Sequence, residues 1–555
     1  MRIVIVGGVA AGMSAAARAR RLDEHAEIIV LERGPYVSFA NCGLPYYVGG
    51  EIADRARLLV QTPESLRAAL DLDVRTHHEV VGLDADAKSV TVRTAEGELR
   101  LDYDALILAP GAVAVRPPIA GLDSPRVRTL RTVDDAVALR ERVEAGATKA
   151  VVLGAGFIGI EAAEALRMQG LEVDVVEFAP HVLPPLEVET AALVTAELRR
   201  LGITVNDGIA AQAVEAGDER DTVVLSDGRR IEADLVVLSV GVRPDTAVFE
   251  AAGVACDRGA MLVDEHGRTN LAGVYAAGDA VVSTDRVTGV RRPVALAGPA
   301  NRAGRRIADH ILRPERARPI PSAVGTAIVR VGELTAAMTG ANRSSLEQAG
   351  IAFDTLHLHP AQHAGYFPGA QQMALVVHIR RGDGLVLGAQ GVGPSGVDKR
   401  IDVLASAIRA GMTADDLIDL DLAYSPIYGS AKDPVNLAGM VGSNVVDGTL
   451  KLWYAEQWEQ LRGESLILDV RSTAEFASGA LPGSLNVPHT ELRARLDEVV
   501  AAAAGRPVRV LCASGVRSHI ANRVLVQAGL DSASLSGGML TLRAVLGESV
   551  LVRSA

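Results

Sequence analysis

Two glycine-rich turns, each between an apolar stretch and a helix-forming stretch, constrain the fold of this chain most. The first is Gly7-Gly8-Val9-Ala10-Ala11-Gly12 and the second is Gly154-Ala155-Gly156-Phe157-Ile158-Gly159. The second matches the G-x-G-x-x-G pattern in full, whereas Val9 replaces the middle glycine of the first. Such glycines permit a tight bend, close approach of the backbone to a pyrophosphate, and close packing of a helix on a strand. Each turn therefore predicts a β-α-β unit of the dinucleotide-binding kind.

An acidic residue follows each turn, at the end of a second apolar strand. Glu32 ends the expected strand 27–31, and Glu177 ends the expected strand 172–176. An acid at this place accepts hydrogen bonds from ribose hydroxyls and repels a 2′-phosphate. One such unit is a weak signal, but two predict two dinucleotide sites. Glu177 favours NADH at the second site, with NADPH possible.

Two later segments have the character of returning strands. Residues 106–111 end in Ala109-Pro110-Gly111, and residues 273–279 end in Gly278-Asp279. We expect both to come back to the first dinucleotide domain. Beyond residue 320 the chain mixes expected strands with expected helices, residues 441–452 are expected to form a linker, and residues 453–555 form a last α/β unit.

Composition excludes several classes of protein. A chain of 555 residues with 48% hydrophobic and 22% charged residues predicts several globular domains. A net charge of −12 argues against nucleic acid or an anionic membrane as a partner. No apolar run is long enough to span a bilayer, and the N-terminal stretch is a strand, a turn and a helix rather than a signal peptide. We therefore expect a cytoplasmic protein.

The chain has three cysteines, Cys42, Cys256 and Cys512, and no Cys-x-x-Cys pair. This sparse set predicts neither a disulfide framework nor structural zinc, and we expect no metal site. Cys42 follows the first β-α-β unit, where a helix N-terminus would lower the pKa of its thiol. The alternative is a buried structural cysteine, and we assign that role to Cys256.

The double glycine-turn layout, the run Ser38-Phe39-Ala40-Asn41-Cys42-Gly43-Leu44-Pro45-Tyr46 and the run Ala276-Ala277-Gly278-Asp279 resemble the pyridine nucleotide–disulfide oxidoreductases with one active cysteine. The resemblance covers about residues 1–440. It is strongest to the coenzyme A-disulfide reductase branch with a fused rhodanese domain, whose members also reduce persulfides and polysulfides. It implies an α/β protein with two Rossmann-like dinucleotide-binding domains, an α+β dimerisation domain and a C-terminal α/β rhodanese domain. The implied bounds are 1–118 and 245–320 for FAD, 119–244 for NAD(P)H, 321–440 for dimerisation and 453–555 for rhodanese.

The resemblance also implies site residues. Those expected to bind FAD or NAD(P)H are Gly7, Gly8, Ala10, Ala11, Gly12, Glu32, Arg33, Ala109, Gly111, Gly154, Gly156, Phe157, Ile158, Gly159, Glu177, Gly241, Gly278 and Asp279. Those expected to bind coenzyme A, as cofactor or substrate, are Arg20, Arg21, Ser38 and Asn41. In a homodimer, Tyr366 together with Tyr424 or Tyr428 would donate a proton to the thiolate that leaves in the partner's site. We prefer Tyr424, and the alternative is that these tyrosines only pack at the interface.

Cys512 opens the run Cys512-Ala513-Ser514-Gly515-Val516-Arg517-Ser518, between an expected strand and an expected helix. Loop N–H groups, the helix dipole and Arg517 would stabilise an anionic sulfur there. This run, with 468–471 and 481–488, resembles the rhodanese motifs. The alternative is a rhodanese-like module without catalysis.

Together these features predict flavin-dependent reduction of coenzyme A-persulfide, coenzyme A-disulfide or polysulfide by NAD(P)H at Cys42, with sulfane sulfur carried by Cys512. The direction of sulfur flow between the two cysteines is left open. One alternative is an NADH oxidase or peroxidase that uses a cysteine sulfenic acid. In that branch of the family, a histidine in the first glycine turn lies beside the active cysteine and donates the proton that peroxide chemistry needs. Ala10 occupies the matching position here, which argues against this alternative. Pure sulfur transfer and a redox-sensing role without catalysis are further alternatives.

Overall fold

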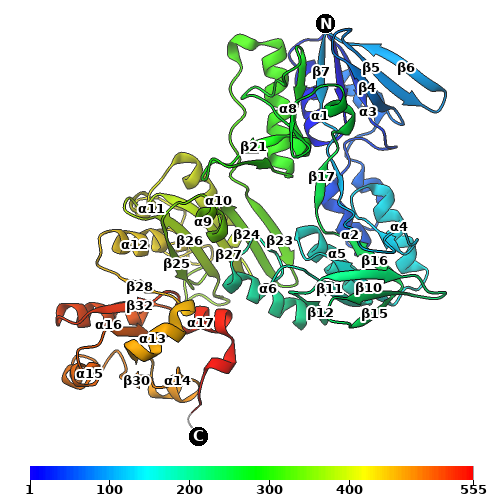
Figure 1. Cartoon of the computed structure of the whole chain (residues 1–555). Coiled ribbons are helices and arrows are strands. Elements are labelled where there is room, and N and C mark those ends of the chain that lie inside the picture. The colour runs from blue at the N-terminus through cyan, green and yellow to red at the C-terminus, as the bar shows by residue number, and fades with distance from the viewer. Residues whose placement is uncertain (554–555) are drawn as a thin grey trace. The chain divides into compact units, whose positions relative to one another are not determined.

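The computed structural model describes residues 1–553, which form two compact units (Figure 1). The first unit contains residues 1–180 and 201–325, and the second contains residues 181–200 and 326 onward. The segment 181–200, which we placed in the NAD(P)H-binding domain, therefore belongs with the second unit. Among the described residues, no helix is both long and apolar enough to cross a membrane.

The first unit contains two parallel five-stranded sheets with the predicted glycine turns at their strand ends. The first sheet has the order β20-β7-β1-β2-β3. Its strands are β1 (Arg2–Val6), β2 (Glu27–Leu31), β3 (Asp73–Arg75), β7 (Ala105–Leu108) and β20 (Val274–Ala276). Helices α1 (Ala10–Arg20) and α8 (Ala297–Leu312) pack together in this domain. Since β7 and β20 both pair in this sheet, the predicted return of the chain is confirmed.

The second parallel sheet has the order β12-β11-β10-β16-β9. Its strands are β9 (Val127–Arg128), β10 (Lys149–Leu153), β11 (Glu172–Val176), β12 (Ile203–Asn206) and β16 (Leu235–Leu238), with α4 (Val133–Glu144) and α5 (Phe157–Met168) as helices. The inner strands are continuous apolar runs because both faces of a parallel sheet are covered. Two antiparallel three-stranded sheets were not predicted: β4 (Glu79–Asp84), β5 (Ser89–Thr94), β6 (Gly97–Asp102), and β13 (Ala211–Glu215), β14 (Asp221–Leu225), β15 (Arg230–Ala233).

The second unit begins with an antiparallel sheet of order β23-β24-β27-β26-β25. Its strands are β23 (Ala327–Val331), β24 (Leu334–Gly340), β25 (Phe353–Leu358), β26 (Ala374–Arg380) and β27 (Val386–Gly393), and its helices are α6 (Val188–Arg200), α9 (Arg343–Gln348), α10 (Val397–Ala410), α11 (Ala414–Ile418) and α12 (Pro434–Val446). The predicted linker 441–452 is wrong in its first half, because α12, capped at Asp433, extends to Val446.

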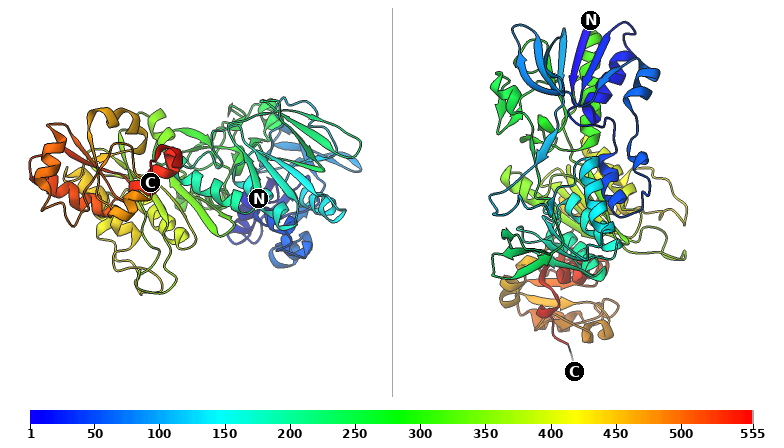
Figure 2. Two further views of the ribbon diagram at one scale, coloured as in Figure 1. Left: turned by 90° about the horizontal axis from the view of Figure 1, so that it is seen from below. Right: turned by 90° about the vertical axis from the view of Figure 1, so that its right-hand side faces the viewer.

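A parallel sheet of order β28-β32-β31-β29-β30 completes the second unit. Its strands are β28 (Leu452–Trp453), β29 (Leu466–Asp469), β30 (Leu485–Asn486), β31 (Val508–Leu511) and β32 (Ser532–Leu535), and its helices are α13 (Trp458–Glu464), α14 (Thr473–Ala477), α15 (Leu496–Ala503), α16 (Val516–Gln527) and α17 (Gly538–Leu546). Both views of Figure 2 place this orange-to-red part beside the yellow part of the same unit.

Buried polar side chains join these two parts of the second unit. In the first part, Glu189 of α6 lies 2.6 Å from His357 Nε2 and 3.0 Å from Arg343. The Nδ1 of the same histidine lies 2.7 Å from the Ser536 hydroxyl of the second part. His359 Nε2 lies 2.9 Å from the Thr541 hydroxyl of α17. A junction of this kind is stable only while its charges and hydrogen bonds stay matched.

Acidification is expected to destabilise the second unit through His359 and Glu189. Burial, and then the neighbouring His357, lower the pKa of His359 to about 4. Because the unfolded chain binds this proton near pH 6.5, stability is complete above that pH and falls by about 2 kcal/mol by pH 5. Burial opposes ionisation of Glu189, but the hydrogen bond and charge of His357 and the charge of Arg343 lower its pKa to about 2. Its contribution is therefore lost between about pH 4.5 and 2.

Urea unfolding of the wild type and of His359→Asn at pH 8, 6.5 and 5 measures the histidine contribution. The wild type should lose more stability than the variant between pH 8 and pH 5. Equal losses in the two proteins would rule out this histidine as the source.

Candidate active sites

The first glycine turn is closed by contacts that only glycine allows. Gly7 has φ +98°, and a Cβ built on it would lie 2.0 Å from the Ala109 carbonyl oxygen. A Cβ on Gly12 would lie 1.9 Å from the Gly7 carbonyl oxygen. Helix α1 begins at Ala10, so Ala10 and Ala11 lie in its first turn. No side chain caps that turn, which leaves N–H groups available for a phosphate.

The second turn repeats this arrangement. A Cβ on Gly154, which has φ +97°, would lie 2.4 Å from the Ser239 carbonyl oxygen, and a Cβ on Gly159 would lie 2.0 Å from the Gly154 carbonyl oxygen. Gly156 has no atom within 4 Å of its Cβ position, so its backbone is open to a ligand. Helix α5 begins at Phe157, also without a side-chain cap, and Ile158 beside it is 41% exposed. The three glycines therefore have the separate roles that the pattern predicts.

The two predicted acids occupy equivalent places. Glu32 accepts hydrogen bonds from the N–H groups of Gly8 and Gly34, both at 2.8 Å. Glu177 accepts from Ala155 at 2.6 Å and from Ala179 at 2.8 Å. Each carboxylate thus ties a glycine turn to the loop after the second strand. Since a carboxylate can accept about four hydrogen bonds, each retains acceptors for ribose hydroxyls.

The other predicted cofactor residues lie at strand ends of the first unit. Ala109 N–H donates to the Val6 carbonyl, and Gly111, Gly241 and Gly278 all have positive φ. Arg33 forms an ion pair with Asp245. Asp279 accepts from Arg131 at 3.2 Å, and Arg131 was not predicted.

Cys42 lies in a short 3₁₀ helix (Asn41–Gly43) directly before α2 (Leu44–Val48), and it is exposed. The loop is tied to the first glycine turn, because Ser38 N–H donates to the Gly8 carbonyl at 2.8 Å. Partial desolvation, and then the carboxylate of Glu161, raise the pKa of the Cys42 thiol. The prediction of a pKa lowered by the protein's own groups is therefore wrong: α2 has only five residues, and the nearby charge is negative.

One predicted coenzyme A ligand is misassigned. Arg20 is 5% exposed, and its guanidinium donates to the backbone carbonyls of Leu70, Asp71, Asp23 and Glu24. It therefore holds the turn after α3 (Pro63–Leu70) and is not available to a ligand. Arg21 and Asn41 are exposed and Ser38 is half-buried, so these three stay predictions.

The predicted tyrosines lie in two neighbouring loops of the second unit. The hydroxyls of Tyr366 and Tyr424 are 3.1 Å apart. Their exposed fractions are 76% and 49%, and Tyr428 is 73% exposed. The hydrogen bond to Tyr424 is the main cause that raises the pKa of Tyr366. The pairing agrees with the preference for Tyr424 over Tyr428.

Cys512 follows β31 and is 1% exposed. The Gly515 N–H donates to its sulfur at 3.2 Å, and the Ser518 hydroxyl lies 3.4 Å from the sulfur. Arg517 lies nearby but forms two 2.7 Å bonds with Glu475, which lower the pKa of that carboxyl to about 2. The loop thus supplies the predicted backbone donor, whereas the guanidinium is shared with an acid that the prediction missed.

Comparison with protein families decides the assignment. The family model described as pyridine nucleotide-disulphide oxidoreductase matches residues 1–304, and the dimerisation domain of the same family matches residues 326–433. The chain belongs to the pyridine nucleotide-disulphide oxidoreductase family. A rhodanese-like domain matches residues 454–543. The predicted family, fold class and enzyme class are therefore confirmed: the protein is an oxidoreductase of this family with a C-terminal rhodanese-like domain.

Several relatives of this oxidoreductase cover most of the chain. A coenzyme A disulfide reductase of Staphylococcus haemolyticus is 34% identical over 79% of this chain and 98% of its own length. Reduced CoADR-RHD of Bacillus anthracis has a TM-score of 0.96 at 38% identity and covers 99% of both chains. A NAD-dependent persulfide reductase from A. fulgidus has a TM-score of 0.91 at 38% identity, over 98% of this chain and 100% of that chain. A water-forming NADH oxidase from Lactobacillus brevis, at 24% identity and a TM-score of 0.77, shares the fold.

Oxidoreductases of this family work with FAD and a nicotinamide nucleotide, and the residues present fit both groups. Helices α1 and α5 have no side-chain cap at their N-termini, and each begins at a glycine turn that has no room for a Cβ. The carboxylates of Glu32 and Glu177 brace these turns and keep acceptors for ribose hydroxyls. In this chain Gly8 and Glu32 would hold the diphosphate and ribose of FAD. Gly156 and Glu177 would do the same for the nicotinamide nucleotide.

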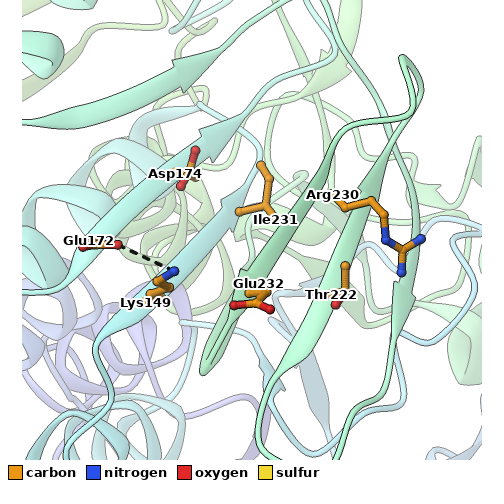
Figure 3. A pocket seen from close by; sticks show the side chains of 7 residues that line it. All are labelled: Lys149, Glu172, Asp174, Thr222, Arg230, Ile231 and Glu232. Carbon is orange, nitrogen blue, oxygen red and sulfur yellow. Dashed lines mark ion pairs between the residues drawn. The ribbon is translucent and has the colours of Figure 1, made fainter.

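Figure 3 shows a cavity of about 420 Å³ elsewhere on the second sheet, lined by Lys149, Glu172, Asp174, Thr222, Arg230, Ile231 and Glu232. Lys149 and Glu172 are the first residues of β10 and β11. Nucleotides bind at the carboxyl ends of parallel strands, so this cavity lies at the wrong end to be the nucleotide site. The side chains that line this cavity include both basic and acidic groups, and Lys149 forms an ion pair with Glu172 at 3.9 Å.

Sequence reasoning missed three residues that contact or influence the predicted ones: Glu161, Arg131 and Glu475. Ser472 and Glu475 form a capping box, and that S-x-x-E pattern would have located Glu475 at the start of α14. Arg131 and Glu161 are far in sequence from the residues they affect, so no local pattern marks them.

Proposed function

We propose that this protein reduces a disulfide or persulfide of coenzyme A with NADH, through Cys42 as its single redox-active thiol. The observation that carries the proposal is the exposed Cys42 thiol in a loop hydrogen-bonded to the first glycine turn. The relatives named for coenzyme A disulfide and persulfide reduction support the substrate class. Ser38, Asn41 and Arg21 are the residues proposed to contact coenzyme A.

In the proposed reaction the Cys42 thiolate attacks one sulfur of the substrate. The S–S bond breaks, a mixed disulfide forms on Cys42, and the other sulfur leaves with the electron pair as a thiolate. Tyr424, hydrogen-bonded to Tyr366, protonates that thiolate from the partner subunit of a homodimer. FAD, when bound, supplies the two-electron link between nicotinamide and sulfur. The sum is one disulfide, one NADH and one proton converted to two thiols and NAD⁺.

We propose that Cys512 carries sulfane sulfur as a persulfide. The Gly515 N–H that already donates to its sulfur would stabilise the negative charge. A persulfide on Cys512 would supply sulfur to coenzyme A or receive it from coenzyme A.

Anaerobic NADH oxidation by the purified flavoprotein tests this function. Coenzyme A-disulfide, coenzyme A-persulfide, polysulfide and hydrogen peroxide are offered separately, with oxygen consumption measured in a parallel assay. Fast turnover with the sulfur acceptors supports the proposal. Turnover only with peroxide or oxygen would assign the chain to the oxidase and peroxidase branch instead.

Loss of the Glu177 charge is expected to weaken the preference for NADH. Glu177→Gln should lower kcat/KM for NADH about tenfold, because ribose acceptors are lost, and leave or improve that for NADPH, because repulsion of the 2′-phosphate is removed. Glu172→Gln, at the other end of β11, is the matched control. Steady-state kinetics with both nucleotides measure the ratio. An unchanged ratio in Glu177→Gln would contradict the assignment of this acid.

A further inference from the structure

The loop that carries Cys512 is hydrogen-bonded to the first turn of α17. The Met539 N–H donates to the Cys512 carbonyl at 2.9 Å, and the Leu540 N–H donates to the Ala513 carbonyl at 3.0 Å. In a trans peptide the C=O and N–H bonds point in opposite directions. These two bonds therefore turn the N–H groups that follow the carbonyls away from α17. The position of α17 thus fixes the direction of the Ala513 and Ser514 N–H groups, in the two peptides just before the Gly515 donor.

A turn of two residues, Ser536 and Gly537, joins β32 to α17, which begins at Gly538. A Cβ built on Gly538 would lie 2.5 Å from the Cys512 carbonyl oxygen. A Cβ built on Gly537 would lie 2.6 Å from the Cβ of His357. The turn is therefore pressed between the Cys512 loop and a residue of the dimerisation domain. Both glycines also have positive φ, which other residues rarely adopt.

His357 fixes the turn with hydrogen bonds. Its Nδ1 lies 2.7 Å from the Ser536 hydroxyl, and its backbone N–H donates to the same oxygen at 3.2 Å. Its Nε2 lies 2.6 Å from Glu189. An ionised carboxylate only accepts, so the Nε2–H donates to Glu189 and fixes the orientation of the ring. The side chains of His357 and Glu189 are each 4% exposed, which excludes water as a competitor.

His359 makes a second contact with this region, inside helix α17. Its Nε2 lies 2.9 Å from the hydroxyl of Thr541, which is 3% exposed in α17. His357 and His359 thus hold the start of α17 at two points. Neither histidine is part of the rhodanese-like domain.

We propose that His357 is a positioning residue for sulfur transfer at Cys512, with His359 as its support, so that the dimerisation domain completes the rhodanese loop. The inference rests on the proposed transfer at Cys512. In that transfer the Cys512 thiolate attacks the outer sulfur of thiosulfate, the S–S bond breaks, and sulfite leaves with the electron pair. Cyanide then takes the outer sulfur as thiocyanate and restores the thiolate. Loop donors must face the sulfur charge in both steps.

Two substitutions in the full-length flavoprotein separate the two hydrogen bonds of His357. The amide of Asn occupies the place of Nδ1 and keeps a partner for Ser536, whereas the amide of Gln reaches the place of Nε2 and keeps a partner for Glu189. His357→Asn should retain thiosulfate-to-cyanide transfer within about threefold of wild type. His357→Gln and Ser536→Ala should lower kcat at least about tenfold with little change in KM for thiosulfate, because orientation and not binding is lost.

NADH oxidation with coenzyme A-disulfide and the thermal midpoint are measured on the same samples to confirm that each variant is folded. The rate of Cys512 alkylation by iodoacetamide, read by mass spectrometry, is a second readout. The alkylation rate separates the proposed sulfur transfer at Cys512 from the positioning role of His357. If the wild type does not transfer sulfur from thiosulfate, the proposed rhodanese activity is contradicted. The alkylation rates of the variants then still test whether His357 positions the Cys512 loop. A wild-type kcat and alkylation rate in His357→Gln, or equal losses in the Asn and Gln variants, would overturn the proposal.

Discussion

Cys42→Ser will lower NADH-driven reduction of coenzyme A-disulfide by at least about 10³-fold, because a serine hydroxyl cannot form the mixed disulfide. The same variant should keep thiosulfate-to-cyanide transfer at Cys512 within about twofold of wild type, because Cys512 lies in the other compact unit. Both activities are measured on one preparation that retains bound flavin, so loss of the cofactor cannot account for the result.

Cys256→Ser is the matched control for this experiment. Cys256 lies on β18 (Cys256–Asp257), is half-buried, and has no predicted chemistry. Its substitution should leave both activities near wild type. Wild-type reduction by Cys42→Ser, or its loss in Cys256→Ser, would show that the reactive thiol has been misassigned.

Tyr424→Phe is expected to lower kcat for coenzyme A-disulfide about 100-fold, the usual loss when a general acid is removed. Tyr366→Phe should have a comparable effect, because its hydroxyl lies 3.1 Å from that of Tyr424. Tyr428→Phe is the control. Tyr428 is similarly exposed, at 73%, and should stay within about twofold of wild type. A larger loss in Tyr428→Phe than in Tyr424→Phe would reverse the assignment.

Subunit mixing tests whether the tyrosine acts across a dimer. Chains of Cys42→Ser and Tyr424→Phe each keep about a hundredth of wild-type activity or less when alone, and they are unfolded and refolded together. If the tyrosine comes from the partner, each mixed dimer has one complete site, and random mixing restores about a quarter of wild-type activity. If Cys42 and Tyr424 act within one chain, the mixture stays inactive.

The sequence predicted the parts of the fold whose signals are local. Gly154 and Gly159 have no room for a Cβ, and the glycine pattern reports that constraint directly. The strands β2 and β11 lie where the apolar pattern placed them, because burial of both faces of a strand leaves a run of apolar residues in the sequence. Glu32 and Glu177 end their strands as expected and brace their turns.

The errors concern side chains whose partners are distant in sequence. Arg20 is on the predicted helix, but whether it faces a ligand or the carbonyls of Leu70 and Asp71 depends on packing. The pKa of Cys42 depends on Glu161, which comes from another domain. A role for His357 was not predicted, because its hydrogen-bond partners Ser536 and Glu189 are distant from it in the sequence.

The central claim is that substrate sulfur becomes covalently attached to Cys42. The most direct measurement is a single turnover: the NADH-reduced protein is mixed anaerobically with less than one equivalent of coenzyme A-disulfide, quenched in acid, digested and read by mass spectrometry. The account predicts coenzyme A in disulfide linkage on the Cys42 peptide, forming and decaying at the rate of turnover. Coenzyme A on Cys512 or Cys256, or thiol products formed with Cys42 never modified, would contradict it.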